Sequence, residues 1–303
     1  MKHRVVLWVA CLLSLLASAA QAQVGVGIAL PRRDYILYEP IMLEVSLLNS
    51  SGKNIVFGED DKWINLEIVR EKVELVSKTD RPIIDKPIYL DAASTATLKT
   101  NLTYTHEIRE PGNYEVQAKV RHKGRTYVSA ILPITVVNGA VQWKQRFAYT
   151  NPKSHKEEVR DYELVAQKVE KGNRLVARIR DPENRRVMCC TPVGDLMGFG
   201  SPEAKIDTGG TLHILNQVAP KQFLYSKISP EGIREKPRFF LAVTAPPALI
   251  ESEDEGILVL GGSEVGEDGK ILVFNRGAPR AVSAIPVTDE EIKKDRKKRD
   301  DDD

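Results

Sequence analysis

Cysteine is scarce in this chain of 303 residues, and two of the three cysteines are neighbours. Cys11 lies near the N-terminus, whereas Cys189 and Cys190 adjoin one another in the second half. A bond between adjacent cysteines closes a strained small ring, and structural disulfides usually close longer loops. We therefore expect no disulfide framework. We interpret both residues as small apolar side chains within a β-strand, with redox chemistry as the alternative.

The chain also lacks an excess of charge of either sign. It contains 44 Lys and Arg against 42 Asp and Glu; Lys2 and Arg4 lie in a leader without acidic residues, so the rest has 42 of each. A nucleic-acid binder normally shows a basic excess. We therefore expect no nucleic-acid partner, and a protein or a glycan remains.

No segment after the leader is apolar for long enough to span a bilayer. In the leader, positively charged residues 1–4 precede an apolar run at 5–16 and then Ala20-Gln21-Ala22, which is the order of a secretory signal peptide. We predict cleavage after Ala22 and a secreted or periplasmic mature chain without a transmembrane segment. Lipidation of Cys11 is the alternative, but the bulky Trp8 stands where such a signal usually has Leu.

Signatures of catalysis are missing as well. The sequence has no Gly-x-Ser-x-Gly elbow, no phosphate-binding glycine loop and no His-Glu-x-x-His zinc helix. Four histidines follow the leader without metal-ligand spacing, and we expect ordinary surface or strand residues: His106, His122, His155 and His213. We assign no catalytic residue, no cofactor and no metal ligand.

One tripeptide suggests an enzymatic activity. Aspartic proteases use two carboxylates that share a proton, each in an Asp-Thr-Gly turn, and residues 207–209 have this sequence. A second copy is missing, and Lys205 stands where that family has an apolar residue, so a hydrolase centred on Asp207 would need a homodimer. We favour a turn that Asp and Gly form for backbone reasons, as we also expect at Asp254.

Three further groups have a functional and a structural interpretation. Acidic segments 59–61 and 251–255 could bind calcium, but they lack the spacing of an EF-hand loop, so we expect solvated loops. Asn49 and Asn101 begin glycosylation patterns, which are common by chance. Four aromatic residues could stack on a sugar or equally fill a core: Trp63, Trp143, Tyr35 and Tyr38.

Residues 24–138 predict a first domain. Apolar and polar side chains alternate with the period of two that a half-buried strand needs, most clearly over 114–121. The other expected strands include 24–28, 41–47, 96–104 and 126–137. Turn residues separate these segments, and roughly seven short strands predict an antiparallel β-sandwich.

The segments Tyr38-Glu39-Pro40 and Pro111-Gly112-Asn113-Tyr114 carry a resemblance. Together with the strands that follow them, they resemble immunoglobulin-like modules of bacterial surface proteins and macroglobulin-type domains. The resemblance covers about 115 residues and implies architecture only, with Tyr114 as the corner tyrosine that opens the penultimate strand. An antibody-type Cys…Trp…Cys framework is missing.

Residues 140–286 predict a second β domain with about three quasi-repeats of roughly 47 residues. Asp161, Asp207 and Asp254 are each expected to open a strand, and Pro-Glu turns at 181–184 and 229–232 recur at a similar spacing. The segment 207–232 resembles blades of sialidase-type propellers. Because fewer than three full units fit, three alternatives stay open: an open or layered sheet, a trefoil-like barrel, and a partial propeller completed by another chain.

Residues 154–169 permit two secondary structures. Ser154 and Glu157 form a capping box that favours a helix, whereas the repeat places a strand over 162–169, which we prefer. The tail 287–303 is almost entirely charged from residue 289 onward, and we expect it to be disordered.

These observations predict an exported, noncatalytic binding or scaffolding protein of the cell envelope. A carbohydrate-binding or protease-inhibiting module is the first alternative, because sandwiches serve many binding functions. A hydrolase centred on Asp207 is the second.

Overall fold

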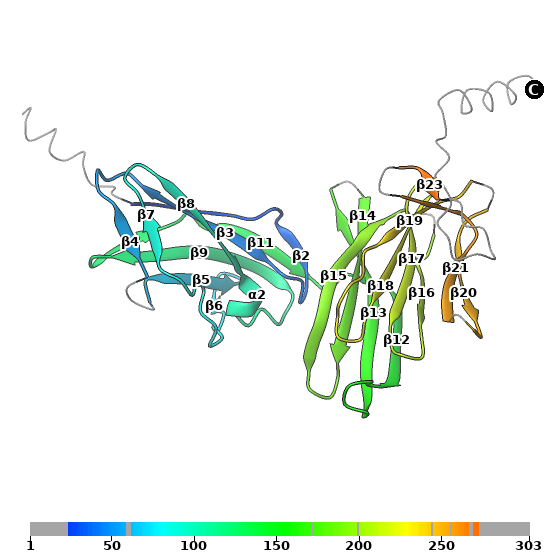
Figure 1. Ribbon diagram of the computed structural model, residues 1–303. Coiled ribbons are helices and arrows are strands. Elements are labelled where there is room, and N and C mark those ends of the chain that lie inside the picture. The colour runs from blue at the N-terminus through cyan, green and yellow to red at the C-terminus, as the bar shows by residue number, and fades with distance from the viewer. Residues whose placement is uncertain are drawn as a thin grey trace, which may run out of the picture. The chain divides into compact units, whose positions relative to one another are not determined.

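The computed structural model describes residues 24–58, 62–170, 172–198, 200–243, 245–254, 256–266 and 269–272 (Figure 1). The chain divides into two compact units, with the boundary between Val137 and Asn138. Regular structure is almost entirely β-strand, so the predicted all-β class is confirmed. The predicted signal peptide, the acidic segment 59–61 and the tail lie outside the described residues. Within the described ranges, no helix combines the length and apolarity needed to cross a membrane.

The described residues of the first unit form short strands and one helical turn. Its elements are β1 (Val24–Ala29), β2 (Asp34–Ile36), β3 (Met42–Asn49), β4 (Ile55–Phe57), β5 (Ile64–Arg70), β6 (Glu74–Leu75), β7 (Ile88–Leu90), β8 (Thr95–Asn101), α2 (Leu102–Thr105), β9 (Gly112–His122), β10 (Arg125–Val128) and β11 (Leu132–Val137). One sheet has the order β1-β3-β8 and a larger one the order β2-β11-β9-β5-β6, with β10 also on β9, while β4 pairs with β7.

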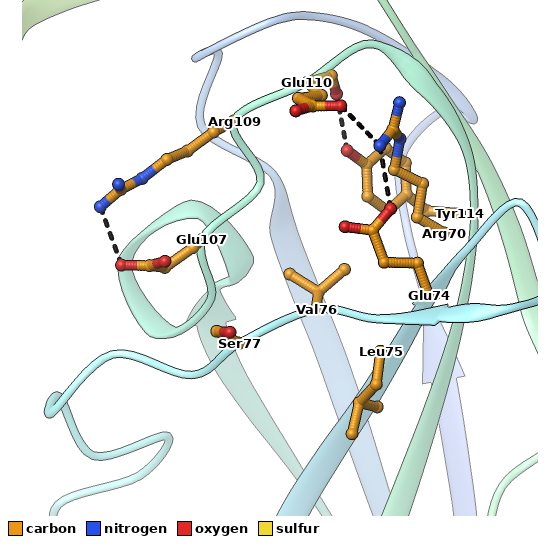
Figure 2. A pocket seen from close by; sticks show the side chains of 9 residues that line it. All are labelled: Arg70, Glu74, Leu75, Val76, Ser77, Glu107, Arg109, Glu110 and Tyr114. Carbon is orange, nitrogen blue, oxygen red and sulfur yellow. Dashed lines mark hydrogen bonds and ion pairs between the residues drawn. The ribbon is translucent and has the colours of Figure 1, made fainter.

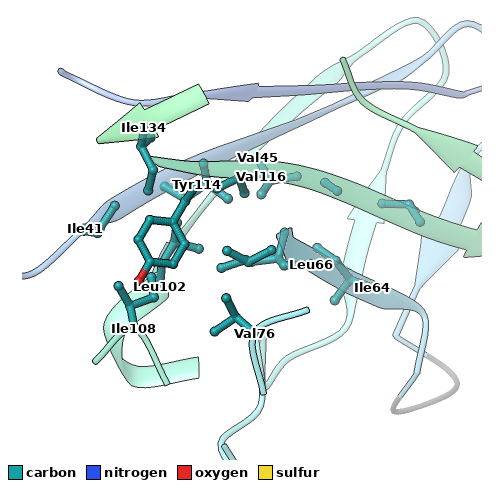
Figure 3. Packing of buried hydrophobic residues seen from close by; sticks show 14 of the residues in the cluster. Ile41, Val45, Ile64, Leu66, Val76, Leu102, Ile108, Tyr114, Val116 and Ile134 are labelled. Carbon is teal, nitrogen blue, oxygen red and sulfur yellow. The ribbon is translucent and has the colours of Figure 1, made fainter. Parts of the chain in front are cut away.

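Among the described residues of this unit, one hydrophobic core joins these sheets. It takes alternate residues of β3, β5, β9 and β11, and Figure 3 shows several of them meeting beside α2. Along β9 the apolar residues from Tyr114 to Val120 are buried, whereas Glu115, Gln117 and Lys119 are only half-buried. The alternation predicted for 114–121 is therefore present, and the layered arrangement is compatible with a sandwich.

Some local predictions for this unit were wrong. The strand expected over 96–104 ends at Asn101, because the Asn101 side chain caps a helical turn by accepting a hydrogen bond from the Thr103 backbone (3.1 Å). The larger sheet is not purely antiparallel either, since β2 runs parallel to β11.

The expected strand 126–137 is interrupted. Both β10 and β11 pair with β9, and Ser129 lies between them. The Ser129 hydroxyl accepts a hydrogen bond from the Ala118 backbone N–H at 2.9 Å. The side chain thus takes a place that a backbone carbonyl has in a regular ladder, so the strand can bend without leaving this donor unpaired.

The second unit consists of longer antiparallel strands. They are β12 (Ala140–Thr150), β13 (Glu157–Val169), β14 (Gly172–Asp181), β15 (Arg186–Leu196), β16 (Glu203–Ile206), β17 (Leu212–Ala219), β18 (Gln222–Ile228), β19 (Arg238–Leu241), β20 (Ala248–Ser252), β21 (Gly256–Leu260), β22 (Ser263–Val265) and β23 (Ile271–Leu272). One sheet has the order β12-β13-β14-β15, another β16-β17-β18-β19-β22-β23, and β20 pairs with β21. Residues 162–169 lie in β13, so the strand interpretation is confirmed.

Side chains on the two faces of β17 pack into two different hydrophobic cores. Leu212 and Ile214 pack with apolar residues of β13, β14 and β15. Leu215 points to the other face and packs with Tyr225 and with Leu249 and Ile257 of the β20–β21 hairpin. The six-stranded sheet therefore has a core on each face, so this unit is layered.

The predicted repeat is only partly real. Asp207 and Asp254 lie in turns that precede β17 and β21, but Asp161 lies inside β13. A carboxylate is tolerated there because Asp161 forms a two-pronged ion pair with Arg146 of the neighbouring β12, at 2.7 and 3.0 Å. The turns at 181–184 and 229–232 do follow β14 and β18.

Candidate functional site

Tyr114 anchors the start of β9. Its ring is buried in the first core, and its hydroxyl donates a hydrogen bond to the Glu110 carbonyl oxygen at 2.6 Å (Figure 2). A tyrosine that hydrogen-bonds a backbone carbonyl a few residues upstream is the arrangement of a tyrosine corner. Burial raises the pKa of this phenol, so it stays protonated and continues to donate.

A recess of about 130 Å³ lies beside this corner and is occupied by its own ion pairs. Arg70 contacts Glu110 at 2.5 Å and Glu74 at 2.9 Å, and Arg109 contacts Glu107 at 2.8 Å (Figure 2). Ligand pockets usually enclose about 300 Å³ or more. Since the recess is small and its charges are paired, we interpret it as a support for the corner.

Asp207 belongs to a tight turn. The Asp207 backbone N–H donates to the Thr211 carbonyl at 3.0 Å, and the Gly210 N–H donates to the Asp207 carbonyl at 2.9 Å. One carboxylate oxygen, Oδ1, accepts a hydrogen bond from the Thr211 N–H at 2.8 Å. This is the backbone role that we expected of an Asp-Gly turn.

The second carboxylate oxygen of Asp207 contacts a buried histidine. His213 Nε2 lies 3.1 Å from Asp207 Oδ2, and His213 Nδ1 lies 2.7 Å from the Tyr225 hydroxyl. His213 is on β17 opposite Lys227 of β18, and Tyr225 is its diagonal neighbour on the same face of the hairpin, so the register brings the two side chains together. The three residues form a polar chain at one edge of an otherwise apolar layer. The prediction that His213 is an ordinary surface or strand residue was therefore wrong.

The protonation of this chain follows from its partners. Burial lowers the pKa of His213 below its ordinary value, although Asp207 opposes the shift. A carboxylate can only accept, so Nε2 of the neutral ring carries the hydrogen, and Nδ1 accepts from the Tyr225 hydroxyl. Burial also raises the pKa of Tyr225, which keeps that hydroxyl protonated.

A recess of about 370 Å³ opens next to the chain, between β17 and β18 and the start of β21. Besides the chain itself, its lining includes Lys227, Glu235 and Arg238. Lys227 contacts Glu235 at 3.3 Å, and Arg238 contacts Glu264 at 3.2 Å. These charged side chains therefore form ion pairs, and they do not give the recess a charge of one sign.

The arrangement does not suit nucleophilic catalysis. In a Ser-His-Asp triad the hydroxyl on the second ring nitrogen is the nucleophile, whereas here that position is taken by the Tyr225 phenol, which burial keeps protonated. Among the described residues lining the recess, the only hydroxyl belongs to Tyr225, which is buried. The geometry is that of a structural polar chain beside a recess.

The structure gives most other candidates structural roles. Cys189 and Cys190 lie in β15 as expected, and burial raises the pKa of Cys189 to about 11, so its thiol is not activated. Asn49 is buried and donates to the Lys53, Leu90 and Asp91 carbonyls, which makes it unavailable to a glycan. Among the described residues, no cluster of three or more His, Cys, Asp or Glu could hold a metal.

Several aromatic and histidine candidates are buried and have structural roles. Trp63 and Tyr35 lie in the first core, so they form no sugar-stacking surface, and Trp143 packs against a core of the second unit. His106 was expected to be an ordinary strand or surface residue, but it is buried; its Nε2 donates to the Leu66 carbonyl at 3.0 Å, and its Nδ1 lies 3.0 Å from the Thr105 hydroxyl. Its partner Leu66 is 40 positions away, which explains why sequence spacing missed this contact.

Comparisons with known proteins identify no family. No family model matches the chain, and no curated protein matches it. Among solved structures, the chain is similar to Spo0M, a sporulation control protein from Bacillus subtilis, at 10% identity and a TM-score of 0.28, covering 55% of this chain and 83% of that one. Similarity at this level supports no conclusion about fold or function.

Proposed function

We propose that the chain is an exported, noncatalytic binding or scaffolding protein of the cell envelope. Export is supported by the leader, where basic residues 1–4, an apolar run and Ala20-Gln21-Ala22 follow in the order of a signal peptide. The first unit would be an immunoglobulin-like module, which is supported by the hydrogen bond from Tyr114 to the Glu110 carbonyl.

The noncatalytic role rests on one observation: both carboxylate oxygens of Asp207 are engaged within the chain. Oδ1 accepts from the Thr211 backbone and Oδ2 contacts His213. An aspartic protease would instead need this carboxylate to face a second one across a cleft, with a shared proton and a water. The Asp207 hydrolase is therefore the less favoured candidate.

N-terminal sequencing of the chain after expression in a bacterium with its own leader tests export. We expect the exported protein to begin at Gln23, and a variant with Arg in place of Leu13 should stay inside the cell because the apolar run is broken. Retention of Met1, or a lipid on Cys11, would contradict the proposal. A glycan array and a protease panel then separate a specific sugar binder or inhibitor from a scaffold.

A further inference from the structure

The outer face of the larger sheet of the first unit carries a recess of about 490 Å³. Its lining comes from β5, β9 and β10, from the segment 78–84, and from Lys62 and Thr105. Five of the lining residues are basic and none is acidic: Lys62, Lys78, Arg81, Lys119 and Arg121. The volume falls in the range of small-molecule sites.

Strand register concentrates these cations. Lys119 and Arg121 are two residues apart on β9, so both point to the face opposite the core. Asn65 of β5 lies opposite Lys119, and Thr126 of β10 lies opposite Arg121. The sheet therefore presents two cations flanked by an amide and a hydroxyl.

The wall formed by residues 77–79 is fixed to the rest of the unit. The Thr79 N–H donates to the Thr105 carbonyl at 3.0 Å, and the Thr79 hydroxyl donates to the Tyr104 carbonyl at 2.6 Å. Glu107 in turn donates its N–H to the Ser77 carbonyl at 2.9 Å. Because backbone bonds hold this segment on both sides of Lys78, the recess is a built feature of the fold.

Three of the cations contact neutral groups. The Lys78 ammonium contacts the Asn65 side-chain oxygen, the Arg121 guanidinium donates to the Lys62 carbonyl at 2.9 Å, and Arg81 lies over the Tyr104 ring at 5.2 Å from its centre. Lys119 has a carboxylate partner, Glu67, at 2.6 Å. Within the described part of the chain, the charges of Lys78, Arg81 and Arg121 are thus not compensated by carboxylates.

We propose that this recess binds a small ligand with at least two anionic groups, phosphate or carboxylate. Ammonium and guanidinium groups form charge-assisted hydrogen bonds with both anions. Ile83 and Ile84, which also line the recess, would contact an apolar part of the ligand. The inference names a ligand class for the binding protein proposed above and depends on that role.

Calorimetric titration of the exported chain with inorganic pyrophosphate and with citrate, at low and at physiological ionic strength, tests the recess. The double variant Lys78→Gln/Arg81→Gln removes two recess cations. Lys53→Gln/Arg125→Gln removes the same charge from exposed positions of this unit that do not line the recess. We expect the first variant to bind about tenfold more weakly or worse, which is about 1.4 kcal/mol, and the second to bind like the wild type.

A vesicle arm identifies the source of a phosphate ligand. If the recess takes lipid headgroups, phosphatidic acid vesicles should bind the wild type and the control variant but not Lys78→Gln/Arg81→Gln, whereas a soluble ligand predicts anion binding without vesicle binding. Thermal melting establishes that both variants are folded.

Two results would overturn the inference. The wild type could fail to bind either anion, or both double variants could weaken binding equally, which would indicate diffuse electrostatic attraction. In either case export and the Asp207 turn would stand, because N-terminal sequencing and acid proteolysis test them independently.

Discussion

The Tyr162 hydroxyl donates a hydrogen bond to the Gly210 carbonyl oxygen, 2.6 Å away and 48 positions later in the chain. Tyr162 belongs to β13, and Gly210 belongs to the turn that contains Asp207. Burial raises the pKa of Tyr162, so its hydroxyl remains a donor. The turn is therefore held from the core as well as by its own backbone bonds.

Gly210→Ala should destabilise the second unit. Gly210 has a φ of +81°, and a β-carbon there would lie 2.9 Å from the ring of Tyr149, so the substitution adds a clash to backbone strain. Gly256→Ala is the matched control, because its φ is +73° and nothing lies within 4 Å of the added carbon. We expect about 1 kcal/mol for the control from the left-handed backbone alone, and clearly more for Gly210→Ala, in urea unfolding. Equal losses would mean that the ring moves aside without cost.

Tyr114→Ala should cost about 3 to 5 kcal/mol of unfolding free energy, as for other large core aromatics. Tyr114→Phe keeps the packing and removes only the hydrogen bond to Glu110, for about 1 kcal/mol. Tyr89→Ala at an exposed position is the control, since that side chain is 76% exposed. Denaturant melts compare the three variants. An unchanged midpoint for Tyr114→Ala would contradict the corner.

Asp207→Asn should lower the unfolding free energy by about 1 to 2 kcal/mol, because the charged acceptor of the Thr211 N–H and of His213 is lost. Asp254→Asn should have a smaller effect. Asp254 is exposed in the turn between β20 and β21, so the two turns are less alike than their sequences suggest. Chemical denaturation of both variants measures the difference, and matched losses would contradict this distinction.

Acidification should destabilise the first unit through His106. Burial lowers the pKa of His106 in the folded state, so the unfolded chain binds more protons once the pH falls below the ordinary histidine pKa of about 6.5. The unfolding free energy should therefore decline from that pH down to the lower folded pKa. The decline should be shallower in His106→Gln and unchanged in His155→Gln, whose side chain is exposed. Parallel pH profiles for the wild type and His106→Gln would contradict the neutral, buried ring.

Local patterns in the sequence predicted much of the fold. The alternation over 114–121 predicted which face of β9 is buried, because successive side chains of a strand point to opposite faces of the sheet. The same reasoning failed at Asn101, where one side chain caps a helical turn, and at Asp161, where an ion pair to Arg146 keeps a charged residue inside a strand. Both exceptions depend on a specific polar partner, which periodicity does not contain.

The candidate sites were less predictable. Asp207 and its turn could be identified from Asp-Thr-Gly, but the contact of His213 with Tyr225 depends on the pairing of β17 with β18. One signal was present: His213 interrupts the apolar run of residues 212–215, where a buried polar group requires a partner. The cationic recess joins β9 to residues 78–84, some 40 positions earlier, and no spacing rule connects them.

Acid proteolysis by the purified exported chain tests the central claim, that Asp207 belongs to a structural turn in a noncatalytic protein. The substrates are unfolded polypeptides at pH values where aspartic proteases work, with Asp207→Asn and Asp254→Asn measured beside the wild type. The account predicts no cleavage by any of the three proteins and a loss of thermal stability in Asp207→Asn. Cleavage by the wild type that persists in Asp254→Asn and vanishes in Asp207→Asn would contradict it.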